Sequence, residues 1–137
     1  MNETSSTFLY DADGVTLIKQ GYFSEKLSRD YGITLDKILP FFKNEYRLCQ
    51  KGKADLKEVL PKYLELWNWS KSVDEFLDYW FTADTIPNKE ALDQIAQISS
   101  YGNFSYLVTD QEKYRAEYIR KTLSLQNKNL LNEMEKY

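Results

Sequence analysis

The sequence predicts a helix-rich α/β protein in which a core of parallel strands with helices carries a bundle of helices. Short apolar, β-prone runs lie at 7–10 and 104–108, and a long, mostly helical stretch separates them. Two strands joined by a helical crossover are expected to lie parallel, with a right-handed connection. We therefore expect residues 1–17 and 84–137 to form the core and residues 18–83 to form an inserted helical domain.

Composition narrows the classes of function. The net charge of −3 and the pI near 5.1 argue against nucleic acid as a partner. No apolar run reaches membrane-spanning length, the first residues lack the features of a secretory signal, and the single cysteine, Cys49, fits a reducing cytoplasm. The absence of histidine excludes Ser-His and Cys-His nucleophile pairs and most zinc sites. We therefore expect a cytoplasmic protein without nucleic-acid or membrane partners, whose chemistry would depend on carboxylates and hard metals.

Apolar stripes and end signals predict about four helices between residues 21 and 83. Ser24 is expected to cap the first helix, which Gly32 ends. Thr34 is expected to cap one long second helix that stops near Gly52. These helices should pack as a compact bundle.

Two further helices complete this predicted bundle. Residues 55–69 carry a continuous apolar face, with a kink expected at Pro61. Ser72 and Glu75 have the spacing of a capping box before another apolar stripe, which runs to Phe81.

The remainder of the sequence returns to the α/β pattern. "TIPNKEALDQIAQISSYG" predicts a turn and a helix that stops at Gly102, before the strand at 104–108. Asp110 is expected to cap a last helix, in which "EKYRAEYIRK" is typical of a solvated face. The tail, which includes Leu130 and Leu131, has loosely helical spacing.

Polar side chains follow both predicted strands. Asp11 and Asp13 end the first strand, before Gly14, and Thr109 and Asp110 end the second. In open parallel sheets, ligands gather at the carboxyl ends of the strands, so these residues form a candidate site. On its own, "DADG" is equally typical of a surface turn.

"FLYDADGV" and "FSYLVTD" together resemble the first two motifs of the haloacid dehalogenase-like hydrolases, which are mostly Mg²⁺-dependent phosphatases and phosphomutases. The first family motif is an apolar strand followed by Asp-x-Asp-Gly-Val/Thr, and the second is an apolar strand ending in Thr or Ser. "TIPNKEALDQI" is similar to the segment that leads back from the family's helical cap, and residues 18–83 are similar to the cap itself. The resemblance implies a partial haloacid dehalogenase-like core, which is Rossmann-like, with a helical cap.

The resemblance also implies residue roles and a substrate class. Asp11 would be the nucleophile that forms an aspartyl-phosphate, and Asp13 the general acid and then base. Mg²⁺ would bind to Asp11 and to the main-chain carbonyl of Asp13. Thr109 and the following backbone N–H, that of Asp110, would hold the phosphoryl oxygens of a small phosphorylated metabolite. True dehalogenases lack the second aspartate, so Asp13 favours phosphate over haloacid.

The third and fourth family motifs have no counterpart in this sequence. No aspartate follows Asp110, and Glu133 and Glu135 follow no apolar strand. We therefore expect a core that stops after the second strand, with reduced activity and with both outer edges of the strand pair open. Two alternatives remain: a catalytically silent interaction module that forms homo-oligomers through its sheet edges or helical bundle, and a phosphomutase.

Overall fold

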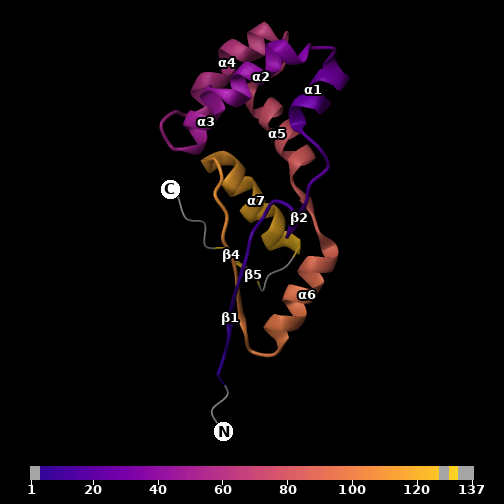
Figure 1. Ribbon diagram of the computed structural model, residues 1–137, viewed down its shortest axis with the longest axis vertical. Coiled ribbons are helices and arrows are strands. Elements are labelled where there is room, and N and C mark those ends of the chain that lie inside the picture. Colours follow the sequence, from indigo (N-terminus) through magenta and orange to yellow (C-terminus); the bar gives the residue numbers. More distant parts are fainter. Residues whose placement is uncertain (1–3, 127–129, 133–137) are drawn as a thin grey trace. The chain divides into compact units, whose positions relative to one another are not determined.

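The computed structural model describes residues 4–126 and 130–132, and the chain divides into two compact units (Figure 1). Among the described residues, the α/β unit comprises 4–19, Thr85–Gln111, 115–126 and 130–132. The helical unit comprises Gln20–Asp84 with Glu112–Tyr114. Each unit is described by itself below. The fold is helix-rich with a small parallel sheet, as the sequence predicts in outline.

A three-stranded sheet forms the centre of the α/β unit. Strands β1 (Thr7–Tyr10), β4 (Phe104–Leu107) and β5 (Leu130–Asn132) lie in the order β1-β4-β5, and both pairs are parallel. The predicted parallel pairing of the first two is confirmed. The helical tendency expected around Leu130 is wrong, because these residues pair with β4 as a strand. The expectation that the core stops after the second strand is therefore wrong, and so is the expectation of an open outer edge on β4.

Strand β1 is more exposed than its apolar sequence predicts. Leu9 is 69% exposed and Phe8 is 37% exposed. Among the described residues β1 pairs only with β4, and successive side chains of a strand point to opposite faces. Strand β1 is therefore an edge strand of the described sheet, and its apolar side chains are largely exposed.

Two helices and a small β-ladder complete the α/β unit. Helix α6 (Lys89–Ser100) begins after Asn88, whose side chain accepts a hydrogen bond from the Ala91 N–H. Helix α7 (Lys113–Gln126) begins three residues after Asp110, so the expected Asp110 cap is wrong. The antiparallel pair β2 (Leu17–Ile18) and β3 (Ile86–Pro87) was not predicted. The core of this unit is a cluster of buried apolar residues: Ala12, Leu17, Leu92, Ile95, Leu107, Ile119 and Leu123.

The helical unit contains five main helices: α1 (Phe23–Tyr31), α2 (Leu35–Lys43), α3 (Glu45–Gln50), α4 (Leu56–Leu66) and α5 (Val73–Asp84). The expected Ser24 cap is wrong, because α1 begins at Phe23 with Tyr22 at the N-cap position. The single helix expected before Gly52 is divided at Asn44, whose side chain donates to the Pro40 carbonyl. Such local bonding by asparagine competes with helix continuation.

Aromatic side chains fill the centre of the helical unit. Phe41, Phe76 and Trp80 are buried, and the Phe23 and Trp80 rings stack with centroids 5.3 Å apart. The predicted capping box is confirmed: the Ser72 hydroxyl accepts from the Glu75 N–H, and the Glu75 carboxylate accepts from the Ser72 N–H.

Candidate functional site

The loop after β1 presents its two aspartates outward by burying the residue between them. Ala12 is fully buried in the core cluster, whereas Asp11 and Asp13 are exposed. The Leu17 N–H donates to the Ala12 carbonyl over 2.9 Å, and the buried Thr16 hydroxyl donates to the Asp11 carbonyl over 2.9 Å. These bonds close a tight loop that holds both carboxylates at its surface.

Strand register places the second polar segment beside this loop. Tyr10 pairs with Leu107, and the Val108 N–H donates to the Tyr10 carbonyl over 2.8 Å. Thr109 follows directly. Asp11 and Thr109 therefore leave neighbouring parallel strands at the same edge of the sheet, as the sequence predicts.

Gln111 links the two segments directly. Its side-chain Nε2 donates to the Asp13 Oδ2 over 2.9 Å and to the Thr109 Oγ1 over 3.0 Å. Thr109 is almost completely buried. Two of the predicted site residues, Asp13 and Thr109, are thus held together by one amide group.

Arg115, near the start of α7, binds Asp13 with both ends of its guanidinium. The Nη2 atom lies 2.9 Å from Oδ1 and the Nη1 atom 3.2 Å from Oδ2. Nη1 also donates to the Gln111 Oε1. The Arg115 side chain is only 8% exposed, whereas that of Asp13 is 48% exposed. Fork-shaped pairing of this kind fixes orientation as well as charge.

Sequence reasoning missed Gln111 and Arg115 because they lie in or beside a stretch that is typical of a solvated face. The sequence does contain a signal that the Arg115 side chain is buried. Arg115, Ile119 and Leu123 are four residues apart, so the arginine continues a stripe of which the other two members are fully buried.

The charges around Asp13 favour its ionised form. Burial raises the pKa of the Asp13 carboxyl. A larger, opposite effect comes from the hydrogen bond and charge of Arg115, the hydrogen bond from Gln111 and the charge of Lys19. The pKa therefore lies below its ordinary value. At neutral pH Asp13 is a carboxylate that accepts hydrogen bonds.

The other two predicted site residues are Asp11 and Asp110. The Asp11 Oδ1 accepts a hydrogen bond from the Ala12 N–H over 2.7 Å. Asp110 is exposed in the segment between β4 and α7, and its backbone N–H does not belong to the first turn of that helix. The expectation of a helix N-terminus directly behind Thr109 is therefore wrong by about one turn.

The candidate donors for a metal ion at this sheet edge are those that the sequence predicts. Among residues 4–126 and 130–132, no group of three or more acidic or cysteine side chains gathers as a metal site. The donors that the sequence predicts are the Asp11 carboxylate and the Asp13 main-chain carbonyl, while the Asp13 carboxylate is bound by Arg115. Mg²⁺ commonly keeps several waters and takes one or two carboxylates together with substrate phosphate, which this donor set allows.

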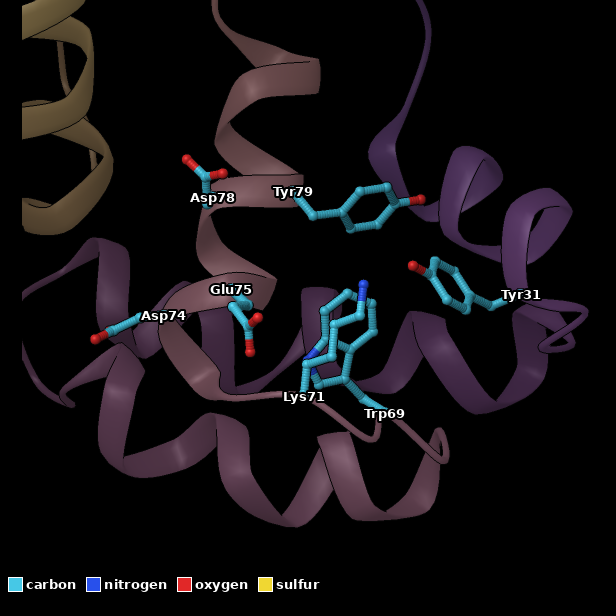
Figure 2. A pocket seen from close by; sticks show the side chains of 7 residues that line it. All are labelled: Tyr31, Trp69, Lys71, Asp74, Glu75, Asp78 and Tyr79. Carbon is cyan, nitrogen blue, oxygen red and sulfur yellow. The ribbon is translucent and has the colours of Figure 1, made fainter.

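A separate pocket of about 500 Å³ lies within the helical unit (Figure 2). Tyr31, Trp69 and Tyr79 supply an aromatic wall, and the Lys71 ammonium lies 5.6 Å from the centre of the Trp69 ring. Its lining also contains three carboxylates: Asp74, Glu75 and Asp78. This excess of negative charge disfavours a phosphate group there, so the pocket is no alternative to the candidate site in the α/β unit.

Cys49 does not supply a second nucleophile. Its side chain is buried in the helical unit, and burial, followed by the charges of nearby carboxylates, raises the pKa of its thiol to about 11. A thiol of this kind is almost entirely protonated at neutral pH and is a poor nucleophile.

Comparison with protein-family models, with curated proteins and with solved structures gives no match to this chain. In the part of the chain that the structure describes, every helix is too short or too polar to cross a membrane.

Proposed function

We propose that the α/β unit hydrolyses phosphate monoesters in the manner of the haloacid dehalogenase-like hydrolases, with Asp11 as the nucleophile. One observation carries the proposal: Asp13 and Thr109, from the ends of two parallel strands, are bonded to the same amide nitrogen of Gln111. A carboxylate pair and a hydroxyl at one sheet edge match the chemistry that phosphoryl transfer through an aspartate needs.

The proposed reaction has two steps. An Asp11 carboxylate oxygen attacks phosphorus, the bond from phosphorus to the leaving oxygen breaks, and that oxygen takes a proton from the protonated form of Asp13, which is the minor form at neutral pH because the pKa of this carboxyl is lowered. Asp13 then removes a proton from water, which attacks the aspartyl-phosphate and restores Asp11 as phosphate leaves. The arrangement described here, in which Asp13 accepts hydrogen bonds from Arg115 and Gln111, corresponds to the base form of the second step.

Thr109 and the backbone N–H of Asp110 would bind the phosphoryl oxygens. Mg²⁺, held by the Asp11 carboxylate and the Asp13 carbonyl, would supply positive charge against those oxygens. The substrate would be a small phosphorylated metabolite.

Hydrolysis of p-nitrophenyl phosphate, with and without Mg²⁺, tests the proposal. We expect activity that needs the metal and that falls by at least about a thousandfold in Asp11→Asn, because the nucleophile is removed. Asp93→Asn, an exposed aspartate on α6 in the same unit, is the matched control and should keep full activity. Activity that survives Asp11→Asn, or a wild-type chain without activity, would contradict the proposal. A screen of phosphorylated sugars for isomerised rather than hydrolysed products separates a phosphomutase from a phosphatase.

We propose as a second candidate a catalytically silent module that self-associates through β1. The exposure of Leu9 and Phe8 on a strand with one described neighbour favours it. Absence of hydrolysis together with a stable dimer by light scattering would support this candidate over the first.

A further inference from the structure

No bond-making or bond-breaking step of the proposed reaction is assigned to Gln111 or Arg115, yet both bind Asp13, and Gln111 also binds Thr109. We propose that these two side chains act as a positioning clamp, which ties the loop carrying Asp13 to the segment carrying Thr109 and so pre-orders a binding site for a tetrahedral oxyanion. The inference rests on the proposed function, because it concerns the same site.

Arg115 is suited to this task by its own fixation. Its side chain is 8% exposed and continues the buried stripe of Ile119 and Leu123 on α7. The guanidinium meets Asp13 with two nitrogens on two carboxylate oxygens. A planar fork that is held at its base by packing fixes both the position and the rotation of the carboxylate.

Gln111 extends the clamp to the second strand. Its Oε1 accepts from Arg115, which defines the orientation of the amide, and its Nε2 then donates to Asp13 and Thr109. Asp13, Gln111 and Arg115 therefore form a closed network of three side chains, and a change in one displaces the others.

The clamp hypothesis and a simple charge effect predict different results for the substitution Arg115→Lys. Lysine keeps the positive charge but offers a compact ammonium that cannot pair with both oxygens of Asp13 and with Gln111 in one plane. If geometry is what matters, Arg115→Lys should behave like Arg115→Gln. If only charge matters, Arg115→Lys should behave like the wild-type protein.

Binding of tungstate, a tetrahedral dianion that needs no turnover, tests the clamp in the full chain by calorimetry. We expect the affinity to fall about tenfold or more in both Arg115→Lys and Arg115→Gln, because displaced hydrogen-bond donors stabilise the bound anion much less. Arg120→Gln is the control: it lies on the same helix but is exposed and pairs with Glu117, and it should bind within about twofold of wild type.

A fourth variant keeps the test informative if the Arg115 variants fail to fold. Gln111→Ala leaves the ion pair between Arg115 and Asp13 in place but removes the link to Thr109, and it should weaken tungstate binding several-fold. Thermal unfolding by circular dichroism identifies which variants are folded.

Three results would overturn the clamp: Arg115→Lys binding as tightly as wild type, Gln111→Ala binding unchanged, or no tungstate binding by the wild-type chain. The proposed function is judged separately, by hydrolysis and its loss in Asp11→Asn. Tungstate binding that depends on Arg115 without any hydrolysis supports the clamp and rejects the enzyme. Hydrolysis that depends on Asp11, with tungstate binding indifferent to Arg115, does the reverse.

Discussion

The two units have cores of different composition: the core of the helical unit is rich in aromatic side chains, and that of the α/β unit is aliphatic. In the helical unit the large aromatic residues Phe41, Phe76 and Trp80 are buried against one another. In the α/β unit, by contrast, strand residues Leu9 and Phe104 are at least half exposed. Each unit therefore has a buried core, but the candidate site lies at the surface of the α/β unit and depends on hydrogen bonds among charged and polar side chains.

The largest effect on the free energy of unfolding is expected from a leucine-to-alanine substitution, which we compare at one position in each unit. Leu60→Ala removes a fully buried side chain from the helical unit and should lower its free energy of unfolding by about 2–5 kcal/mol. Leu9→Ala removes a side chain that is 69% exposed and should cost less than about 1 kcal/mol. Urea unfolding followed by tryptophan fluorescence reports on the helical unit, which contains all three tryptophans, and far-ultraviolet circular dichroism reports on both units.

A large cost for Leu9→Ala would contradict this comparison. It would mean that β1 is covered in solution, as the self-association candidate requires. Repeating the measurement at two protein concentrations would then distinguish a second copy of the chain from another cause, because dimer stability rises with concentration.

A smaller effect is expected from the ion pair that orders the site. Asp13→Ala removes the carboxylate that pairs with the nearly buried Arg115 and should destabilise the α/β unit by about 1–2 kcal/mol, discounted because Asp13 is half exposed. Glu117→Ala removes the partner of Arg120 from an exposed pair on the same helix and should leave stability unchanged. Thermal unfolding by circular dichroism checks both. Equal losses of stability in Asp13→Ala and Glu117→Ala would show that the burial of Arg115 does not strengthen its ion pair.

The fold was predictable where short-range signals decide it. The strands at 7–10 and 104–107, and the capping box of Ser72 and Glu75, follow from local pattern and were predicted correctly. The pairing of β5 with β4 and the exposure of β1 depend on which segments meet in space. Two adjacent leucines at 130 and 131 fit a strand as well as a helix, so periodicity could not decide between them.

The candidate site was predictable to the same extent. Asp11, Asp13 and Thr109 could be found because polar residues after apolar strands mark a sheet edge. Gln111 and Arg115 are missing from that prediction because charge-rich helix starts are usually solvated. Only the four-residue spacing of Arg115 from a buried stripe reveals that its side chain turns inward.

The smallest expected effect concerns helix ends in the helical unit, where sequence signals and bonds can be separated. Ser72 and Thr34 both lie directly before a helix. The Ser72 hydroxyl accepts a hydrogen bond from the Glu75 N–H over 3.1 Å, whereas Thr34 makes no side-chain capping bond. Ser72→Ala should therefore lower the free energy of unfolding by about 1 kcal/mol, and Thr34→Ala by no more than a few tenths of that. Urea unfolding followed by tryptophan fluorescence measures both in the unit that contains them. A cost for Thr34→Ala as large as that for Ser72→Ala would mean that residue type before the helix, rather than the hydrogen bond itself, stabilises these helices.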